Sequence, residues 1–223
     1  MDKRIADIML KMKGLSAKHP LDTCGEFPPR WDEPLSEERV AAFEKQNGIK
    51  LPEDYRRFIT TVVGSGTQPF YGLVSIAERR SGDLKADLSK KFPFTLKNPL
   101  NIGNISDEEY QKLFGGFKVR SDAESDEEYV EPLDGYPDFG FIELCEEGCG
   151  MFNILIVNAL DEETCGTVWF YDLADDAGIF PLAAPETGKA MRFLDWLEYY
   201  VDRSLALDDE DYFSYGELAA ESI

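Results

Sequence analysis

The sequence is poor in the side chains that carry most metal and imidazole chemistry. Its 223 residues include one histidine, His19, and four cysteines. A single histidine excludes a two-histidine zinc motif and leaves His19 as the only imidazole base. Cys145 and Cys149 lack the spacing of a zinc knuckle, and no second pair follows them. We therefore expect no catalytic residues, no metal site and no cofactor.

Basic residues are also scarce, since Lys and Arg total 23 against 44 Asp and Glu, which gives a net charge of -21. A surface this acidic repels nucleic acid and anionic membranes. It attracts a basic protein and accelerates its association in a salt-dependent way. The charge therefore predicts a basic protein partner, with no nucleic acid and no membrane, although an acidic surface also serves solubility alone.

Long hydrophobic runs are missing as well. No stretch approaches the roughly 18 apolar residues that span a bilayer. The first residues, 1–4, are followed by an amphipathic pattern instead of the apolar run of a signal peptide. Four cysteines in a chain of this length do not make a disulfide framework. We therefore expect a cytoplasmic protein.

Helical periodicity appears first near the N-terminus. Apolar residues at helical spacing predict a helix over residues 1–14, ended by Gly14. Ser36 is typical of an N-cap and Gly48 of a left-handed stop, so a second helix lies between them. Pro52 suits the first position of a third helix. The loop that follows, residues 64–66, lacks the ending of a P-loop, and we interpret it as a tight turn that needs positive φ.

The second half of the sequence favours strands. A last helix is predicted over residues 187–204. Short gaps between the strand candidates favour antiparallel neighbours, and the whole order indicates an α+β fold with a mainly antiparallel sheet packed against helices. We expect one domain over residues 1–206, with an insertion at about 78–138, followed by an acidic tail over 207–223. The strand candidates are residues 70–74, 140–145, 152–158, 166–172 and 179–182.

Two blocks, residues 35–76 and 139–204, carry the motifs of a known family. The first has a Phe-Glu pair, a Gly, Leu-Pro-x-x-Tyr-x-x-Phe and a Gly-rich loop, which here are Phe43, Glu44, Gly48, Leu51, Pro52, Tyr55, Phe58, Gly64, Ser65 and Gly66. The second has Gly148, Cys149 and Gly150, the segment 166–172, and Phe193, Trp196 and Leu197. This pattern resembles the SUKH superfamily.

The resemblance implies an α+β fold and a role in binding, not catalysis. Bacterial members of the superfamily are often immunity proteins that neutralise toxins, frequently nucleases, and fungal members regulate cell-wall assembly. Our leading hypothesis is an immunity protein that blocks a basic toxin domain. The alternatives are an intracellular adaptor or regulator and, least favoured, a hydrolase that uses Cys149 or a carboxylate pair such as Glu146 and Glu147. In a chain this acidic, such glutamate pairs are more often solvated turns.

The candidate partner-binding residues form three groups. Phe70 and Tyr71 lie beside the Gly-rich loop, and buried aromatic anchors dominate binding energy. Two acidic stretches would attract a basic partner, although such runs are often a solvated face. The acids are Asp122, Glu124, Asp126, Glu127 and Glu128 in the insertion, and Asp208, Asp209, Glu210 and Asp211 in the tail.

Overall fold

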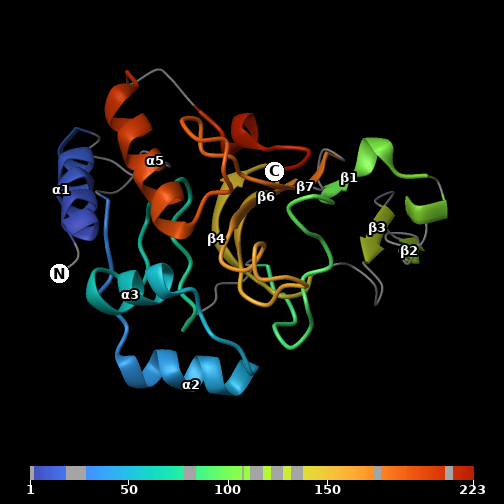
Figure 1. Ribbon diagram of the computed structural model, residues 1–223, viewed down its shortest axis with the longest axis horizontal. Helices are drawn as coiled ribbons and strands as arrows, with labels where there is room; N and C mark the ends of the chain where they lie inside the picture. The colour runs from blue at the N-terminus through green and yellow to red at the C-terminus, as the bar shows by residue number, and fades with distance from the viewer. Residues whose placement is uncertain are drawn as a thin grey trace.

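Five antiparallel strands form the central sheet of the computed structural model, in the order β1-β7-β6-β5-β4 (Figure 1). The strands are β1 (Leu100–Asn101), β4 (Phe141–Gly148), β5 (Met151–Ile156), β6 (Val168–Asp172) and β7 (Gly178–Pro181). The structure describes residues 3–18, 29–77, 84–106, 108–110, 118–121, 128–131, 138–172, 177–208 and 213–223. The predicted α+β class and the four C-terminal strand candidates are confirmed.

Both faces of the sheet are buried. Neighbouring residues of each strand point to opposite sides, so each strand contributes to two cores. Ile142, Leu155 and Phe170 belong to the core on the helical side. Their neighbours Phe141 and Ile154, together with Trp169, belong to a second core on the other side. Loops from residues 84 to 105 supply the cover over that second core. This explains why β6 is apolar or aromatic at every position before Asp172.

The helices lie mainly on one face of the sheet (Figure 1). They are α1 (Lys3–Lys18), α2 (Glu37–Asn47), α3 (Glu53–Thr61) and α5 (Phe193–Ala206), with short 3-10 turns η1 (Ile102–Asn104) and η2 (Tyr215–Leu218). Residues 108–110 are also helical.

The caps of α2 are those that the sequence predicts. Ser36 accepts a hydrogen bond from the Arg39 N–H at 3.3 Å, and Gly48 ends the helix at φ 67°. Glu44 is buried and accepts a hydrogen bond from the Leu51 N–H at 3.0 Å. The Phe-Glu, Gly and Leu-Pro motif therefore fixes the corner between α2 and α3, with Pro52 as the N-cap of α3.

Two predicted helix boundaries are wrong. Helix α1 runs through Gly14 to Lys18, because Leu15 extends the buried stripe of the helix. The last helix begins at Phe193, not at 187, because the chain first turns at Gly188, whose N–H donates to the Ala184 carbonyl at 2.8 Å. The tail is not wholly separate, since Phe213 and Tyr215 are buried in the core.

Residues 70–74 do not form a strand. Phe70 and Gly72 adopt positive φ, which is incompatible with extended chain. The segment still runs along the outer edge of β4, where the Tyr71 N–H donates to the Glu146 carbonyl and the Val74 N–H to the Leu144 carbonyl. It therefore covers that edge without joining the sheet as a regular strand.

The Gly-rich loop is a turn, but positive φ is not what it requires. A Cβ at Gly66 would lie 2.6 Å from the Trp31 ring, and one at Gly64 would lie 2.9 Å from the Glu33 carbonyl. The Gly66 N–H already donates to the Leu73 carbonyl at 3.2 Å. Close approach of the segment 31–33 therefore selects glycine here.

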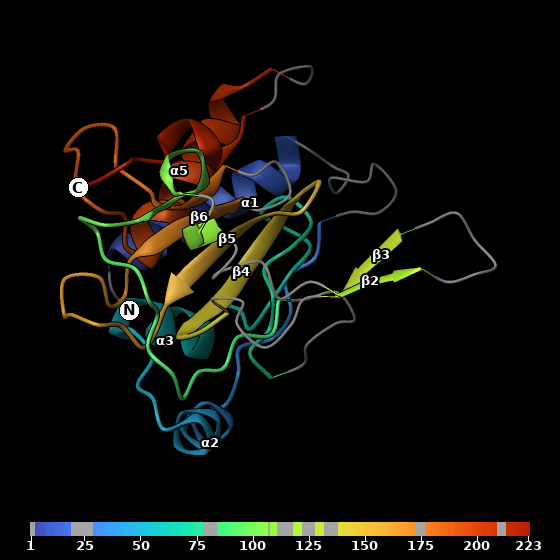
Figure 2. The ribbon, with the colours of Figure 1, turned by 90° about the vertical axis from the view of Figure 1, so that its right-hand side faces the viewer.

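A two-stranded hairpin, β2 (Lys118–Ser121) and β3 (Glu128–Glu131), lies apart from the five-stranded sheet (Figure 2). The strands pair antiparallel from Lys118 with Glu131 to Ser121 with Glu128. Both strands belong to the predicted insertion.

Candidate partner-binding surface

The two aromatic residues predicted to contact a partner point in opposite directions. Phe70 is 6% exposed, and its ring centroid lies 5.3 Å from that of Tyr200 and 5.4 Å from that of Phe213. The prediction that Phe70 faces a partner is therefore wrong: the turn directs this ring into the core. Tyr71 is 48% exposed and stays a candidate.

Tyr71 lies against the turn between β4 and β5. A Cβ at Gly148 would be 3.1 Å from the Tyr71 ring, so the ring rests on bare backbone. Gly148, Cys149 and Gly150 all have positive φ, and Cys149 is exposed. We call Tyr71 and residues 148–150 the Tyr71 corner. It offers a partner an aromatic side chain held in place by a tight turn.

Next to this corner, the segment that follows α5 is hydrogen-bonded to a buried carboxylate of β4. Glu147, 6% exposed, accepts hydrogen bonds from Ser214 Oγ at 2.7 Å and from the Tyr215 N–H at 3.3 Å. Asn153 donates to the same carboxylate and accepts from the Trp196 Nε1–H at 3.0 Å. Burial raises the pKa of Glu147, and the hydrogen bonds oppose that rise. We call residues 213–223 the docked segment.

The role of Glu147 was not found from the sequence, which favoured a solvated Glu146–Glu147 turn. That prediction is wrong for Glu147. Alternation alone does not find it, because it would place Glu146 on the same side as Ile142 and Leu144. Register shifts between Glu143 and Cys145 and between Glu146 and Gly148 change the phase of β4, so Glu147 is buried and Glu146 only partly so.

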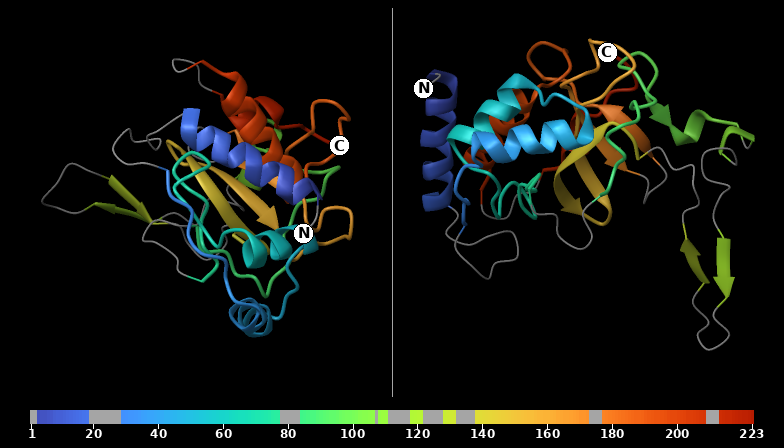
Figure 3. Two further views of the ribbon diagram at one scale, coloured as in Figure 1. Left: turned by 90° about the vertical axis from the view of Figure 1, so that its left-hand side faces the viewer. Right: turned by 90° about the horizontal axis from the view of Figure 1, so that it is seen from below.

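Only some of the predicted acids lie among the residues that the structure describes. Asp122, Glu124, Asp126 and Glu127 lie outside the described residues, and Glu128 begins β3. Asp208 is exposed just after the end of α5, while Asp209, Glu210 and Asp211 lie outside the described residues. The Phe70–Phe213 contact brings the Tyr71 corner next to the docked segment. The hairpin β2–β3 lies elsewhere (Figure 3).

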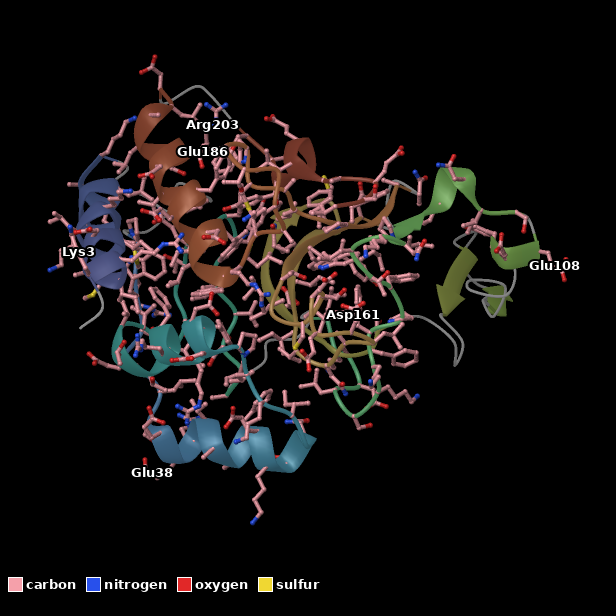
Figure 4. The ribbon with its side chains drawn as sticks, viewed as in Figure 1. Lys3, Glu38, Glu108, Asp161, Glu186 and Arg203 are labelled. Atoms are coloured by element: carbon pink, nitrogen blue, oxygen red, sulfur yellow. The ribbon has the colours of Figure 1, made fainter. Side chains whose placement is uncertain are left out.

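Negative charge also surrounds the fold. Figure 4 labels Glu38 on α2, Glu108 in the segment 108–110, Asp161 between β5 and β6, and Glu186 before α5, and all four are exposed. These acids lie on different sides of the molecule. Figure 4 also labels the exposed cations Lys3 and Arg203, so the surface charge is mixed although the net charge is negative.

Of the groups considered for catalysis, His19 lies outside the described residues. The Glu147 carboxylate, two residues before Cys149, accepts hydrogen bonds from Ser214, Tyr215 and Asn153. Among the residues that the structure describes, no group of three or more His, Cys, Asp or Glu side chains is placed to hold a metal ion. No helix in the same part of the chain has the length and apolar character needed to cross a bilayer.

Residues 34–185 match the model of the SMI1 / KNR4 family (SUKH-1). The match begins just before α2 and ends just after β7, and it leaves out α1, α5 and the docked segment. No curated protein matches the chain significantly.

Proposed function

Because this chain belongs to the SMI1/KNR4 family (SUKH-1), we propose that it is a protein-binding module that acts without turnover and neutralises a basic, nuclease-type toxin domain. The observation that carries the proposal is the net charge of -21 on a fold of this family. The acids exposed on α2 and on several loops support attraction of a partner of opposite charge.

In this mechanism the acidic surface stands in for the phosphate backbone that a nuclease recognises. Complementary charge raises the association rate toward roughly 10⁸–10⁹ M⁻¹s⁻¹ at low salt. A surface aromatic buried on binding then slows dissociation. Tyr71 fits that second role because its ring is exposed but rests on the β4–β5 turn.

The acids in the insertion and in the tail are the proposed electrostatic contacts. Reversing Asp122, Glu124, Asp126 and Glu127 to Lys is expected to weaken binding and to flatten its salt dependence. The matched control reverses four exposed acids outside the insertion, Glu33, Glu162, Glu163 and Glu186. An equal loss of affinity in both variants would assign the effect to net charge and not to the insertion.

The experiment that tests the function begins with the purified chain on a column. Lysate of its own organism is applied at low salt and eluted as the salt rises. A basic toxin domain recovered near stoichiometry is expected, and its nuclease activity should fall to zero at one equivalent of the chain. Recovery of cell-envelope or signalling proteins alone would favour the adaptor role instead.

A further inference from the structure

Helix α1 has the opposite charge to the rest of the chain. It carries five of the 23 basic residues and a single acid, Asp7. The remaining chain is correspondingly more acidic. Such a helix is the kind of segment that an acidic protein is built to attract.

The helix packs on α5 through an apolar stripe (Figures 1 and 3). Its buried residues, at helical spacing, are Ile5, Ile8, Met12 and Leu15. A Cβ at Gly14 would lie 3.9 Å from Leu205 of α5, so the two helices approach closely there. This is the pattern of an amphipathic helix bound in a groove.

Charge pairs line the same contact. Arg4 lies 2.6 Å from Asp195 and 2.9 Å from Glu198. Lys11 lies 3.1 Å from Glu198 and 2.8 Å from Asp202. We call these three acids the α5 acidic face. Successive members are three and four residues apart, about one helical turn, and they meet cations spaced seven residues apart on α1.

The end of α5 adds a further attraction. Lys18 donates to the carbonyl oxygens of Leu205 and Leu207, at the negative end of the α5 dipole. From its first turn to its last, α1 is therefore bound by α5 through cations that flank an apolar stripe.

Helix α1, like α5, lies outside the family match. The family match starts at residue 34, and residues 19–28 join α1 to the next described segment. The strand pairings of the sheet and the caps of α2 do not involve α1, whose contribution to the fold is its apolar stripe in the main core.

We propose that α1 is an intramolecular stand-in for a basic amphipathic helix of the partner, and that the α5 acidic face is the surface on which that helix docks. The proposal rests on the proposed function for the existence of a basic partner. Because α1 belongs to the same chain, it competes with any incoming helix, and a partner helix needs matched cations and apolar residues to displace it.

The test uses the full chain and a labelled peptide of residues 3–18. The variant Arg4→Glu with Lys11→Glu places like charges against the α5 acidic face and releases the tethered helix. We expect this variant to bind the peptide at least about tenfold more tightly than the wild-type chain, because its docking surface is unoccupied. Binding should weaken as salt rises.

The matched control is Lys3→Glu with Lys13→Glu, which makes the same change in net charge on exposed positions of α1, outside the four ion pairs. The proposal is overturned if the control gains as much affinity as the first variant, since general attraction would then explain both. A peptide that carries Glu at positions 4 and 11 is expected not to bind.

A measurement on the wild-type chain keeps the test decisive if the first variant does not fold. Hydrogen exchange of the α1 amides is followed as unlabelled peptide is added to excess. Faster exchange in α1 alone is expected on displacement, and unchanged exchange at millimolar peptide refutes the proposal. Because no toxin is present, failure here leaves the toxin-binding proposal standing, and failure of toxin capture leaves a positive peptide result standing.

Discussion

The Glu147 carboxylate accepts a hydrogen bond from Ser214 Oγ at 2.7 Å, across 67 residues of sequence. The same carboxylate accepts from the Tyr215 N–H, and the Tyr215 hydroxyl donates to the Trp196 carbonyl. One buried acid therefore fixes the segment that follows the acidic tail residues to the end of β4.

Replacing Glu147 by Ala should release the docked segment. The change leaves Asn153, Ser214 and the Tyr215 N–H without their shared acceptor, and each buried donor left unpaired costs about 1–3 kcal/mol. We expect a loss of about 3 kcal/mol in the free energy of unfolding, measured in urea. Hydrogen exchange should accelerate in residues 213–223, whereas Glu146→Ala, as the control, should leave both readings nearly unchanged. Equal effects of the two variants would contradict this role for Glu147.

Substitution of Phe70 should lower stability, whereas substitution of Tyr71 should weaken partner binding. Phe70→Ala removes a ring packed on Tyr200 and Phe213, and we expect about 3–5 kcal/mol of destabilisation. Tyr71→Ala removes an exposed ring and should change stability by less than about 1 kcal/mol. Calorimetry of the isolated protein gives the change in stability, and titration against the captured partner gives the change in affinity. Unaltered affinity of the Tyr71→Ala variant would remove Tyr71 from the proposed contact.

Position 66 should require glycine only because its neighbours leave no room for a side chain. In Gly66→Ala the new methyl group would meet the Trp31 ring at 2.6 Å and the Arg30 carbonyl at 2.8 Å. Overpacking of this kind costs about 1–3 kcal/mol, to be read from the shift in the thermal midpoint. Gly103→Ala is the control, because its nearest neighbour is the Asn101 side chain at 3.4 Å and it lacks positive φ. A Gly66 variant as stable as the control would show that Arg30 and Trp31 move aside.

Asp138 should make stability fall as the pH rises through 6. Burial raises its pKa to about 6, while the hydrogen bond from the Tyr171 hydroxyl at 2.9 Å opposes the rise. An unfolded aspartate titrates near pH 3.9. The folded state therefore prefers the protonated carboxyl, and its contribution to stability is full below about pH 4 and is lost as the pH rises through about 6.

Asp138→Asn tests this directly because the amide keeps an acceptor for Tyr171 and carries no charge. We expect the variant to exceed the wild type by about 1–2 kcal/mol at pH 7.5 and to match it near pH 4. Urea titrations at both pH values measure the difference. The exposed Glu217→Gln variant serves as the control for loss of one negative charge. A constant difference across pH would exclude titration of Asp138 as its cause.

Local chemistry explains which features were predictable. Ser36, Gly48 and the Phe-Glu and Leu-Pro motif act within a few residues of one another, so the α2–α3 corner follows from sequence spacing. The four C-terminal strands follow from apolar residues bounded by turns.

The remaining features depend on contacts between distant segments. Helix α1 continues past Gly14 because packing on α5 outweighs the weak helix propensity of glycine. No local pattern tells which of two adjacent aromatics enters the core, since the positive φ of Phe70 decides it. The pairing of Glu147 with Ser214 spans 67 residues, so only the folded chain brings the two together.

The cover over the outer edge of β4 limits how this protein is recognised by others. The Tyr71 and Val74 N–H groups already occupy the Glu146 and Leu144 carbonyls. An incoming extended peptide would have to peel this segment away before it could extend the sheet. The same cover keeps neighbouring copies from joining edge to edge at β4, a common route to aggregation.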